Sequence, residues 1–454
     1  MITYNDLLQE GDDKRDFVKR VIADHKDSAD YAMAQVADDY NRRKNRTIMN
    51  YQKLLYTMSG RAVPDNYSAN YKLCSNFFSR FVTQENQFLL GNGVTWNDEA
   101  TAKKLGADFD SKLQEAGENA LVHKMAFGFW NKDHVEVFTF LEFAPLWDEE
   151  DGAMKAGVRF WQIDDSKPLR ATLYELDGYT DYIWRNGKEG EILHEKRPYI
   201  LEMEGTEADG MEIKDGENYD GFPIVPLWGN KYHQSEFVGM RENIDAYDLI
   251  KSGFADDLDD ASQIYWTIQN AGGMDDVDLA KFIERMKTVK AAVVEDNEAR
   301  AESHTLEVPY AAREAVLDRL RNDLYEDFMA LDTKNMADGA VTATQIEAAY
   351  EPLNQKTDKF EYCVLDFIQG ILALAGIEDS PTFTRSMVVN TTETINNVLA
   401  GAQYLPEDYI TRKILTLLGD GDQADQLLID MDAENMDRFA GEGTEPETEN
   451  NGEE

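Results

Sequence analysis

The distribution of apolar residues divides the chain into a helical first part, a β-rich middle and a helical last part. Residues 1–60 contain few glycines and no proline, which favours helix. Residues 71–90 carry a dense apolar face that stops at Gly91, and this predicts a helix with a glycine at its C-terminal end. Another helix is predicted over roughly 99–127.

The pattern changes between about Val135 and Trp228 to short runs of β-branched and aromatic residues that partly alternate with polar ones. Asn186-Gly187 is typical of a hairpin turn. We therefore predict a meander of short antiparallel strands, interrupted by an acidic, glycine-containing loop at 202–220. The prolines of Phe222–Trp228 suit an edge strand that ends this region.

Two helices with a single apolar stripe follow, at 241–264 and 310–330, because apolar residues recur there at steps of three and four. The stripes consist of Ile244, Tyr247, Ile250, Phe254, Leu258 and Ala261 in the first helix, and of Val316, Leu320, Leu324 and Phe328 in the second. Four aspartates, Asp256, Asp257, Asp259 and Asp260, fall outside the first stripe. Between the helices, the pattern predicts a break at Gly272-Gly273, a short helix at 277–286 and strands at 289–294 and 304–308.

Residues 331–341 show no periodicity and are predicted to form a loop. Thr342 with Gln345 matches a capping box, so a long helix is predicted over 342–375. Pro352 lies inside that helix and should kink it, because proline removes one hydrogen bond and clashes with the preceding turn. The buried side should hold Ile346, Leu353, Phe360, Val364, Phe367 and Ile371. A strand at 384–389 and helices at 392–402, 406–418 and 422–438 complete the pattern.

The charge is strongly acidic: 454 residues hold 45 Lys+Arg and 88 Asp+Glu, a net charge of −43. A surface that grips DNA, RNA or anionic lipid neutralises phosphates and is basic, so this balance argues against such a surface. The 42% of hydrophobic residues indicates a folded body. Residues 439–454 are predicted to be a disordered acidic tail, since 441–454 contain no apolar residue.

No motif for catalysis, cofactor binding or metal binding is found. The two cysteines, Cys74 and Cys363, are far apart and form no CxxC pair, which favours a reducing compartment. There is no P-loop, GxSxG or HExxH, and the six histidines are scattered. The N-terminus lacks the pattern of a signal peptide, and no apolar run is long enough for a bilayer. We therefore expect no enzyme, no cofactor, no metal and no membrane.

The chain resembles the portal proteins, or head-to-tail connectors, of tailed bacteriophages, and the likeness covers most of residues 40–437. Segments with this resemblance follow one another in the order of that family. They are Asn76 through Phe88-Leu89-Leu90-Gly91, Phe127-Gly128, Ala144-Pro145-Leu146-Trp147-Asp148, Phe222-Pro223-Ile224-Val225-Pro226, Asn243-Ile244-Asp245-Ala246-Tyr247-Asp248 with Ser252, Phe383-Thr384-Arg385-Ser386, and Thr391 onward.

The resemblance implies an α+β portal fold with the parts of that family. These are a wing (1–240, with a return strand in 376–390), a first stem helix (241–264), a clip (265–309), a second stem helix (310–330), a tunnel loop (331–341), a long kinked helix (342–375), crown helices (391–438) and the tail (439–454). The wing consists of a helical N-terminal part followed by the antiparallel β meander.

The resemblance also implies a structural function. Such proteins form a ring of about twelve subunits at one capsid vertex. Double-stranded DNA passes through the ring during packaging and ejection, without tight binding. The implied partners are the terminase motor, neck or adaptor proteins, and scaffolding and major capsid proteins. The implied location is the capsid vertex of a virion made in the bacterial cytoplasm.

The net charge fits this function. An acidic channel wall repels the duplex at short range, because charges are screened over about 8 Å at physiological salt. DNA would therefore move through the acidic channel without being bound, whereas a basic channel would hold DNA tightly. Contacts with DNA are therefore expected in the tunnel loop, from Lys334, Asn335, Met336 and Asp338. Subunit packing is expected from the stem stripes, at Ile244, Tyr247, Phe254, Leu258, Leu320 and Leu324.

Two other functions remain open at the level of sequence. An acidic inhibitor that mimics DNA would carry its charge on a compact surface and behave as a monomer or dimer. A carboxylate-based hydrolase would show enzymatic activity as a small particle. The 88 acidic residues supply many candidate pairs of catalytic carboxylates. Particle size separates the three functions.

Overall fold

The computed structural model describes residues 1–56, 60–66, 68–185, 189–206, 210–261, 265–269, 281, 300–304, 310–336, 342–386, 391–419 and 427–429. The chain forms two compact units, which we treat separately. The first unit comprises Met1–Ala330 and Gln355–Arg385, and the second comprises Leu331–Asn354 and Ser386–Glu454. None of the helices in the described ranges is long and apolar enough to cross a lipid bilayer.

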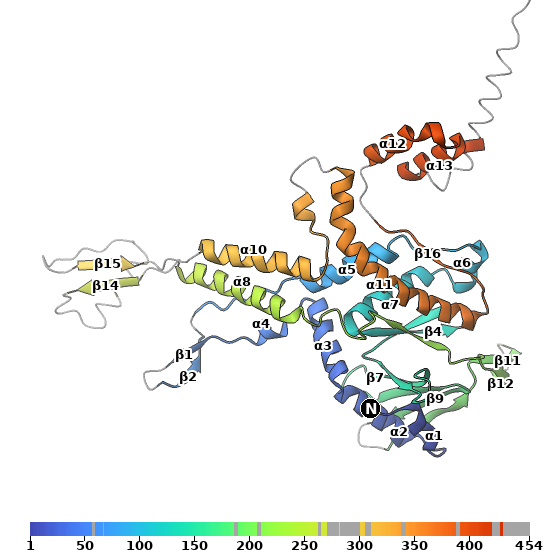
Figure 1. The fold of residues 1–454 in the computed structure, drawn as a ribbon. Coiled ribbons are helices and arrows are strands. Elements are labelled where there is room, and N and C mark those ends of the chain that lie inside the picture. The colour runs from blue at the N-terminus through green and yellow to red at the C-terminus, as the bar shows by residue number, and fades with distance from the viewer. Residues whose placement is uncertain are drawn as a thin grey trace, which may run out of the picture. The chain divides into compact units, whose positions relative to one another are not determined.

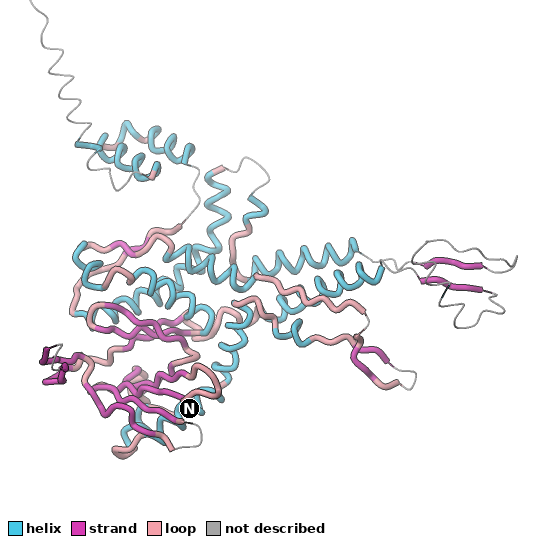
Figure 2. Tube along the Cα trace, turned by 180° about the vertical axis from the view of Figure 1, so that it is seen from behind, coloured by secondary structure: helices cyan, strands magenta, loops and turns pink. Residues whose placement is uncertain are grey.

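The first unit combines helices with antiparallel sheets (Figure 1). Its helices are α1 (Tyr4–Gln9), α2 (Arg15–Asp27), α3 (Ala29–Asn41), α4 (Arg46–Asn50), α5 (Phe77–Leu90), α6 (Glu99–Leu105), α7 (Phe109–His123), α8 (Arg241–Ala261), α10 (Tyr310–Asp327) and the C-terminal part of α11 (Ala343–Ala375). Helices α8 and α10 lie side by side, as Figure 1 and the reverse view in Figure 2 both show.

The strands form one five-stranded, one three-stranded and several two-stranded sheets within the described residues. The five-stranded sheet has the order β10-β9-β8-β7-β6, formed by β6 (Phe143–Trp147), β7 (Met154–Trp161), β8 (Leu169–Glu175), β9 (Gly178–Trp184) and β10 (Glu191–Arg197). The three-stranded sheet has the order β13-β4-β5, formed by β4 (Met125–Asn131), β5 (His134–Thr139) and β13 (Ile224–Trp228). The two-stranded sheets pair β1 (Leu54–Tyr56) with β2 (Ala62–Pro64), β11 (Ile200–Thr206) with β12 (Gly210–Glu217), β14 (Tyr265–Gln269) with β15 (Arg300–His304), and β3 (Val94–Thr95) with β16 (Thr382–Phe383).

Two hydrophobic clusters hold the first unit together. The first joins α5 and α7 to α11 and to the end of α10, through residues such as Phe81, Leu121, Phe328 and Phe367. The second packs α1 and α2 against the strands of the β meander. Burial of large apolar side chains stabilises each cluster by roughly 1.5–3 kcal/mol per side chain relative to exposure.

The second unit contains the N-terminal part of α11, the short 3-10 helices η1 (Thr333–Met336) and η2 (Ala402–Tyr404), and the helices α12 (Thr391–Ala400) and α13 (Glu407–Leu418). Helices α12 and α13 contact each other. The predicted capping box at the start of α11 is confirmed. The Thr342 N–H donates to Gln345 Oε1 at 3.1 Å, and the Gln345 N–H donates to Thr342 Oγ1 at 3.4 Å.

Several predicted boundaries are confirmed. Helix α5 ends at Gly91, α8 and α10 lie within the predicted ranges, and α11 ends at Ala375. Strand β13 is an edge strand, where Pro226 is tolerated. Pro352 lies inside α11. The kink that we expect there stays a prediction.

Other predictions in the N-terminal half are wrong. The helix over 99–127 is two helices, because Gly106 has φ +96° and ends α6, and the following strand β4 begins at Met125. Residues 54–56, expected to be helical, form strand β1. Residues 71–76 are not helical, and the backbone N–H groups of Tyr71, Leu73 and Ser75 instead bind side chains of α8, as described below.

One predicted loop and one predicted strand are also wrong. Several further predictions concern residues that the structure does not describe. The acidic segment at 202–220 forms the hairpin β11–β12 instead of a loop. The strand expected at 384–389 lies at Thr382–Phe383, where it pairs with β3. In the strand predicted at 304–308, only His304 is described, as the last residue of β15. The hairpin turn at 186–187, the break at 272–273, the helix at 277–286 apart from Lys281, the strand at 289–294 and most of 422–438 lie outside the described residues.

Candidate functional site

Helix α8 holds an extended segment of the chain through its polar face. The backbone N–H groups of Ser75, Leu73 and Tyr71 donate to Asp248 Oδ1 at 2.9 Å, to Ser252 Oγ at 3.1 Å and to Asp256 Oδ1 at 2.7 Å. Acceptors four residues apart on a helix are about 6 Å apart along its axis. Every second N–H of an extended chain points the same way, about 6.6 Å apart. The two repeats therefore match, and the segment lies antiparallel along α8.

The carboxylates of Asp248 and Asp256 are buried, although Asp256 was predicted outside the apolar stripe. Asp248 also accepts from Asn45 Nδ2 at 2.8 Å, and burial raises the pKa of its carboxyl group. Asp256 is buried and pairs with Lys53 Nζ at 3.0 Å. One turn before Asp248, Asp245 accepts from Thr47 Oγ1 at 2.7 Å. Hydrophobic periodicity missed these acceptors, and their own spacing at 245, 248, 252 and 256 was the available signal.

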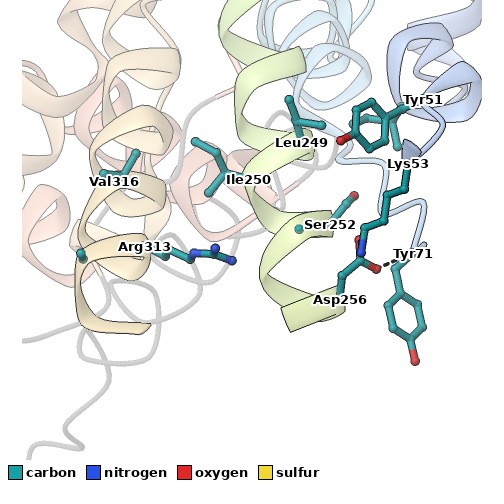
Figure 3. A pocket seen from close by; sticks show the side chains of 12 residues that line it. Tyr51, Lys53, Tyr71, Leu249, Ile250, Ser252, Asp256, Arg313 and Val316 are labelled. Carbon is teal, nitrogen blue, oxygen red and sulfur yellow. Dashed lines mark hydrogen bonds and ion pairs between the residues drawn. The ribbon is translucent and has the colours of Figure 1, made fainter. Parts of the chain in front are cut away.

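A groove lies along α8 between this segment and α10 (Figure 3). Its volume is about 440 Å³. Tyr51, Lys53 and Tyr71 line one side, and Arg313 and Val316 of α10 line the other, as Figure 3 shows. The remaining lining residues are Ile48, Leu249, Ile250, Ser252, Gly253, Asp256 and Ala312.

The residues predicted for stem packing divide between the interior and the surface. Ile244 and Leu324 are buried in the chain's own first hydrophobic cluster. Tyr247, Phe254 and Leu320 are half-buried. Leu258 has 53% of its surface exposed. The large apolar side chains that the described residues of α8 and α10 leave exposed are Leu249, Leu258, Tyr310 and Val316, and of these Leu249 and Val316 line the groove.

The residues predicted to meet DNA lie in or beside η1. Lys334 is exposed, and its backbone N–H donates to Asp332 Oδ1 at 3.0 Å. The backbone of Asn335 and Met336 completes η1, but their side chains lie outside the described residues. Asp338 lies outside them as well. The role of these four residues stays a prediction.

A buried cluster of three charges was not predicted. Lys356 Nζ lies 2.8 Å from Glu85 Oε2 and 2.9 Å from Glu236 Oε2, and 3.1 Å from the centre of the Phe328 ring. Burial raises the pKa of Glu85 to about 7, with Glu236 adding to the effect and Lys356 opposing it. Burial lowers the pKa of Lys356, but the two carboxylates outweigh that effect and raise it.

Lys356 could have been found from the sequence, because it follows Leu353 by three residues and precedes Phe360 by four on the predicted buried face of α11. A charge on such a face needs a partner. The cluster joins α5, the segment before α8 and α11, so its arrangement is structural. In the part of the chain that the structure describes, no three His, Cys, Asp or Glu side chains gather into a metal site.

The chain is similar to known portal proteins. A family model described as "Phage portal protein, SPP1 Gp6-like" matches residues 20–435. The portal protein of Clostridium phage phiCD119 is 27% identical over 272 residues, which cover 57% of this chain and 58% of that protein. The portal protein of Bacillus phage SPP1 is 21% identical over 393 residues, which cover 77% of this chain and 74% of that protein.

Solved structures with some similarity come from gene transfer agent (GTA) particles. One is the neck of an empty particle computed with C6 symmetry, with a TM-score of 0.45 and 11% identity, covering 76% of this chain and 90% of that chain. Another is the neck of a native particle computed with C12 symmetry, with a TM-score of 0.42 and 10% identity, covering 76% and 89%. The family assignment rests on the sequence match, which spans most of the chain: this chain belongs to the SPP1 Gp6-like family of phage portal proteins.

Proposed function

We propose that this chain is a structural subunit of a ring at one capsid vertex of a tailed phage, the conduit for DNA during packaging and ejection. The observation that carries this proposal is the family match over residues 20–435. A ring of about twelve copies is the expected assembly. The ring would dock the terminase motor during packaging and neck or adaptor proteins afterwards, and scaffolding and major capsid proteins would surround it.

The parts of the chain take the following roles in this proposal. The wing comprises 1–240 and 376–390, the stem helices are 241–264 and 310–330, and the clip is 265–309. The tunnel loop is 331–341, the long helix 342–375 and the crown 391–438. Helices α8 and α10 provide the stem, where their contact and the exposed Leu258 support packing against neighbouring subunits.

The acidic composition supports passage of DNA without retention. A channel formed by a chain of net charge −43 repels the duplex over about 8 Å at physiological salt. Contacts would be confined to the tunnel loop, at Lys334, Asn335, Met336 and Asp338. Lys334 is exposed, as this role requires. The purified ring should therefore show no tight, salt-sensitive binding to double-stranded DNA, in contrast to a protein with a basic channel.

Sizing and electron microscopy of the full-length protein test the proposal. We expect annular particles with a mass about twelve times that of the 51.7 kDa chain. Particles that stay monomeric or dimeric under assembly conditions would contradict the proposal and favour an acidic inhibitor. Hydrolase activity of such a small particle would favour the enzyme alternative.

A further inference from the structure

The chain leaves and re-enters its first unit at two points that one contact joins. It leaves this unit after Ala330 and returns to it at Gln355. Phe328 lies two residues before the exit, and the Lys356 ammonium group lies 3.1 Å from the centre of its ring. Lys356 is the second residue after the re-entry. The contact between Phe328 and Lys356 therefore ties the end of α10 to the part of α11 that belongs to the first unit.

The end of α10 has a strained backbone at the exit. Met329 has a φ of +59°, in the left-handed region that glycine usually occupies at the end of a helix. The Met329 N–H donates to the Glu326 carbonyl at 3.0 Å, and the Ala330 N–H donates to the Tyr325 carbonyl at 2.9 Å. A side chain in this conformation persists only where the surrounding structure holds it. The adjacent Phe328 is buried and supplies such a contact.

Helix α11 is weakened just before the re-entry. Pro352 lacks the N–H that would bind the Ala348 carbonyl, so α11 loses one backbone hydrogen bond about one turn before Lys356. A cavity of about 230 Å³ lies beside Lys356 and is lined only by residues of the first unit, among them Phe328 and Met329. The space that Lys356 and Phe328 need to move apart is therefore present.

The charges around Lys356 balance only when one carboxyl group is protonated. Lys356 Nζ lies 2.8 Å from Glu85 Oε2 and 2.9 Å from Glu236 Oε2, so two carboxylates face one ammonium group. The side chains of Glu85 and Lys356 are 2% and 14% exposed, and an unbalanced charge is costly in such a place. The cluster is neutral when Glu85 is protonated and has a net charge of −1 when Glu85 is ionised. The folded-state pKa of Glu85, about 7, places this change near neutral pH.

Few other charges act on Glu85. Among the described residues, Asp327 of α10 and Lys359 of α11 line the same cavity and have opposite charges. Helices α3 and α7 also pack against α5, but no charged group of these two helices shifts the pKa of the Glu85 carboxyl. The charge of the cluster is therefore set by Glu85, Glu236 and Lys356.

We propose that Glu85, Glu236 and Lys356 form a proton-controlled latch on the exit and re-entry points of the first unit. The latch is closed while Glu85 is protonated, because the neutral cluster keeps Lys356 on Phe328. Ionisation of Glu85 gives the cluster a net negative charge, which favours hydration. The end of α10 and the turn of α11 at Lys356 then separate more often. The latch is a property of the single chain and goes beyond the proposed function.

Hydrogen exchange of the full-length chain at about pH 6 and about pH 8 tests the latch. Protection factors, which correct for the direct effect of pH on exchange, are measured for residues 324–330 and 355–360. The pKa of Glu85 is the ordinary 4.5 when the latch is open and about 7 when it is closed, so the closed form is favoured at low pH. Protection at the latch should therefore be about tenfold lower at the higher pH.

Low concentrations of urea separate the latch from global unfolding. Urea accelerates exchange in proportion to the surface that an opening exposes, so it has little effect on a small local opening. Exchange at the latch should respond to pH but hardly to urea. Exchange in the five-stranded sheet serves as the reference for global unfolding and should accelerate with urea.

Variants that change the number of charges make the test specific. Glu85→Gln and Glu236→Gln each leave one carboxylate for Lys356, so the latch should stay closed at both pH values. The double variant leaves Lys356 without an ionic partner in the cluster, and its latch should be open at both. Glu347→Gln removes an exposed carboxylate from α11 and should keep the pH dependence of the wild type.

Equal protection of the latch at both pH values in the wild type overturns the inference. A pH effect that grows with urea as strongly at the latch as in the sheet also overturns it, because the cluster would then act only on global stability. A pH effect that survives Glu85→Gln does the same, since another group would titrate. The wild type and the single variants decide the question even if the double variant does not fold. None of these results depends on ring formation, so the proposed function is tested separately.

Discussion

Lys356 is a largely buried side chain of the first unit that is compensated by two ionic partners. Its ammonium group lies between Glu85 and Glu236, and both carboxylates are held by elements distant in sequence. Removing one member of a buried ionic cluster leaves the others without compensation, which is costlier than removing an exposed pair. The cluster therefore sets the position of α11 against α5.

We predict that Lys356→Met destabilises the protein by about 3–5 kcal/mol, because two carboxylates lose their buried partner. Urea denaturation followed by near-ultraviolet circular dichroism measures the change. Lys359→Met, on an exposed position of the same helix, is the control and should change stability by no more than about 0.5 kcal/mol. A Lys356→Met protein as stable as this control would contradict a structural role for the cluster.

The raised pKa of Glu85 predicts a pH dependence of stability. The ordinary pKa of 4.5 becomes about 7 in the folded chain, so the folded state binds the proton more tightly than the unfolded state. Stability from this group is complete below pH 4.5 and is lost as the pH rises to about 7, with a slope of at most about 1.4 kcal/mol per pH unit.

The difference in unfolding free energy between the wild type and Glu85→Gln, measured from pH 4.5 to 8, isolates this group. We expect the wild type to lose stability relative to the variant across this range, because glutamine does not titrate. A flat difference would mean that Glu85 has an ordinary pKa in the folded chain.

At the scale of elements, α8 binds different neighbours on different faces. One face meets α10 through contacts such as the ion pair of Arg313 with Asp257, and another accepts the N–H groups of residues 71–75. The extended segment satisfies its backbone through side chains instead of a neighbouring strand. Its stability therefore depends on few residues of α8.

We predict that Asp248→Ala destabilises the chain by about 1–3 kcal/mol, because the Ser75 N–H and the Asn45 amide lose their buried acceptor. Hydrogen exchange should accelerate in residues 45–76 more than in the β meander. Glu242→Ala removes an exposed carboxylate from the same helix and serves as the control. Equal exchange in both variants would show that the segment is held by other contacts.

The sequence predicted the long elements of this fold better than their contacts. Helices α8, α10 and α11 follow from stripes of apolar residues, and the start of α11 follows from the local pair Thr342 and Gln345. Asp256 was placed outside the apolar stripe, yet it is buried, because hydrophobic periodicity does not reveal whether another segment covers a polar face. The apolar pattern also predicted one helix across Gly106. The positive φ angle of Gly106 ends the first helix there, so the chain forms two helices.

At the scale of the whole molecule, the acidic charge has more than one role. Part of it serves as buried acceptors on α8, and part neutralises Lys356 in the core. The remainder gives the surface its strong negative charge. Assembly of such chains into a ring must overcome their mutual repulsion, so apolar contacts between subunits have to supply the attraction.

We predict that Leu258→Asp damages ring assembly without unfolding the subunit, because Leu258 is largely exposed in the single chain and would meet a neighbour in the stem. Negative-stain microscopy and sedimentation measure the fraction of closed rings, which should fall at least tenfold. Ile163→Asp adds the same charge at a more exposed position and should leave assembly unchanged. Closed rings of the Leu258→Asp protein would refute the stem assignment.

The contribution of α11 to the first hydrophobic cluster has a consequence for synthesis of the chain. Phe78 and Phe81 emerge early from the ribosome, but their cluster is completed by Phe360, Phe367 and Ile371 near the other end. At about 5–20 residues per second, the interval is on the order of 15–60 s. During that time the aromatic side chains of α5 have no completed core. The nascent chain therefore exposes these aromatic side chains through most of its synthesis, before it can meet another copy of itself.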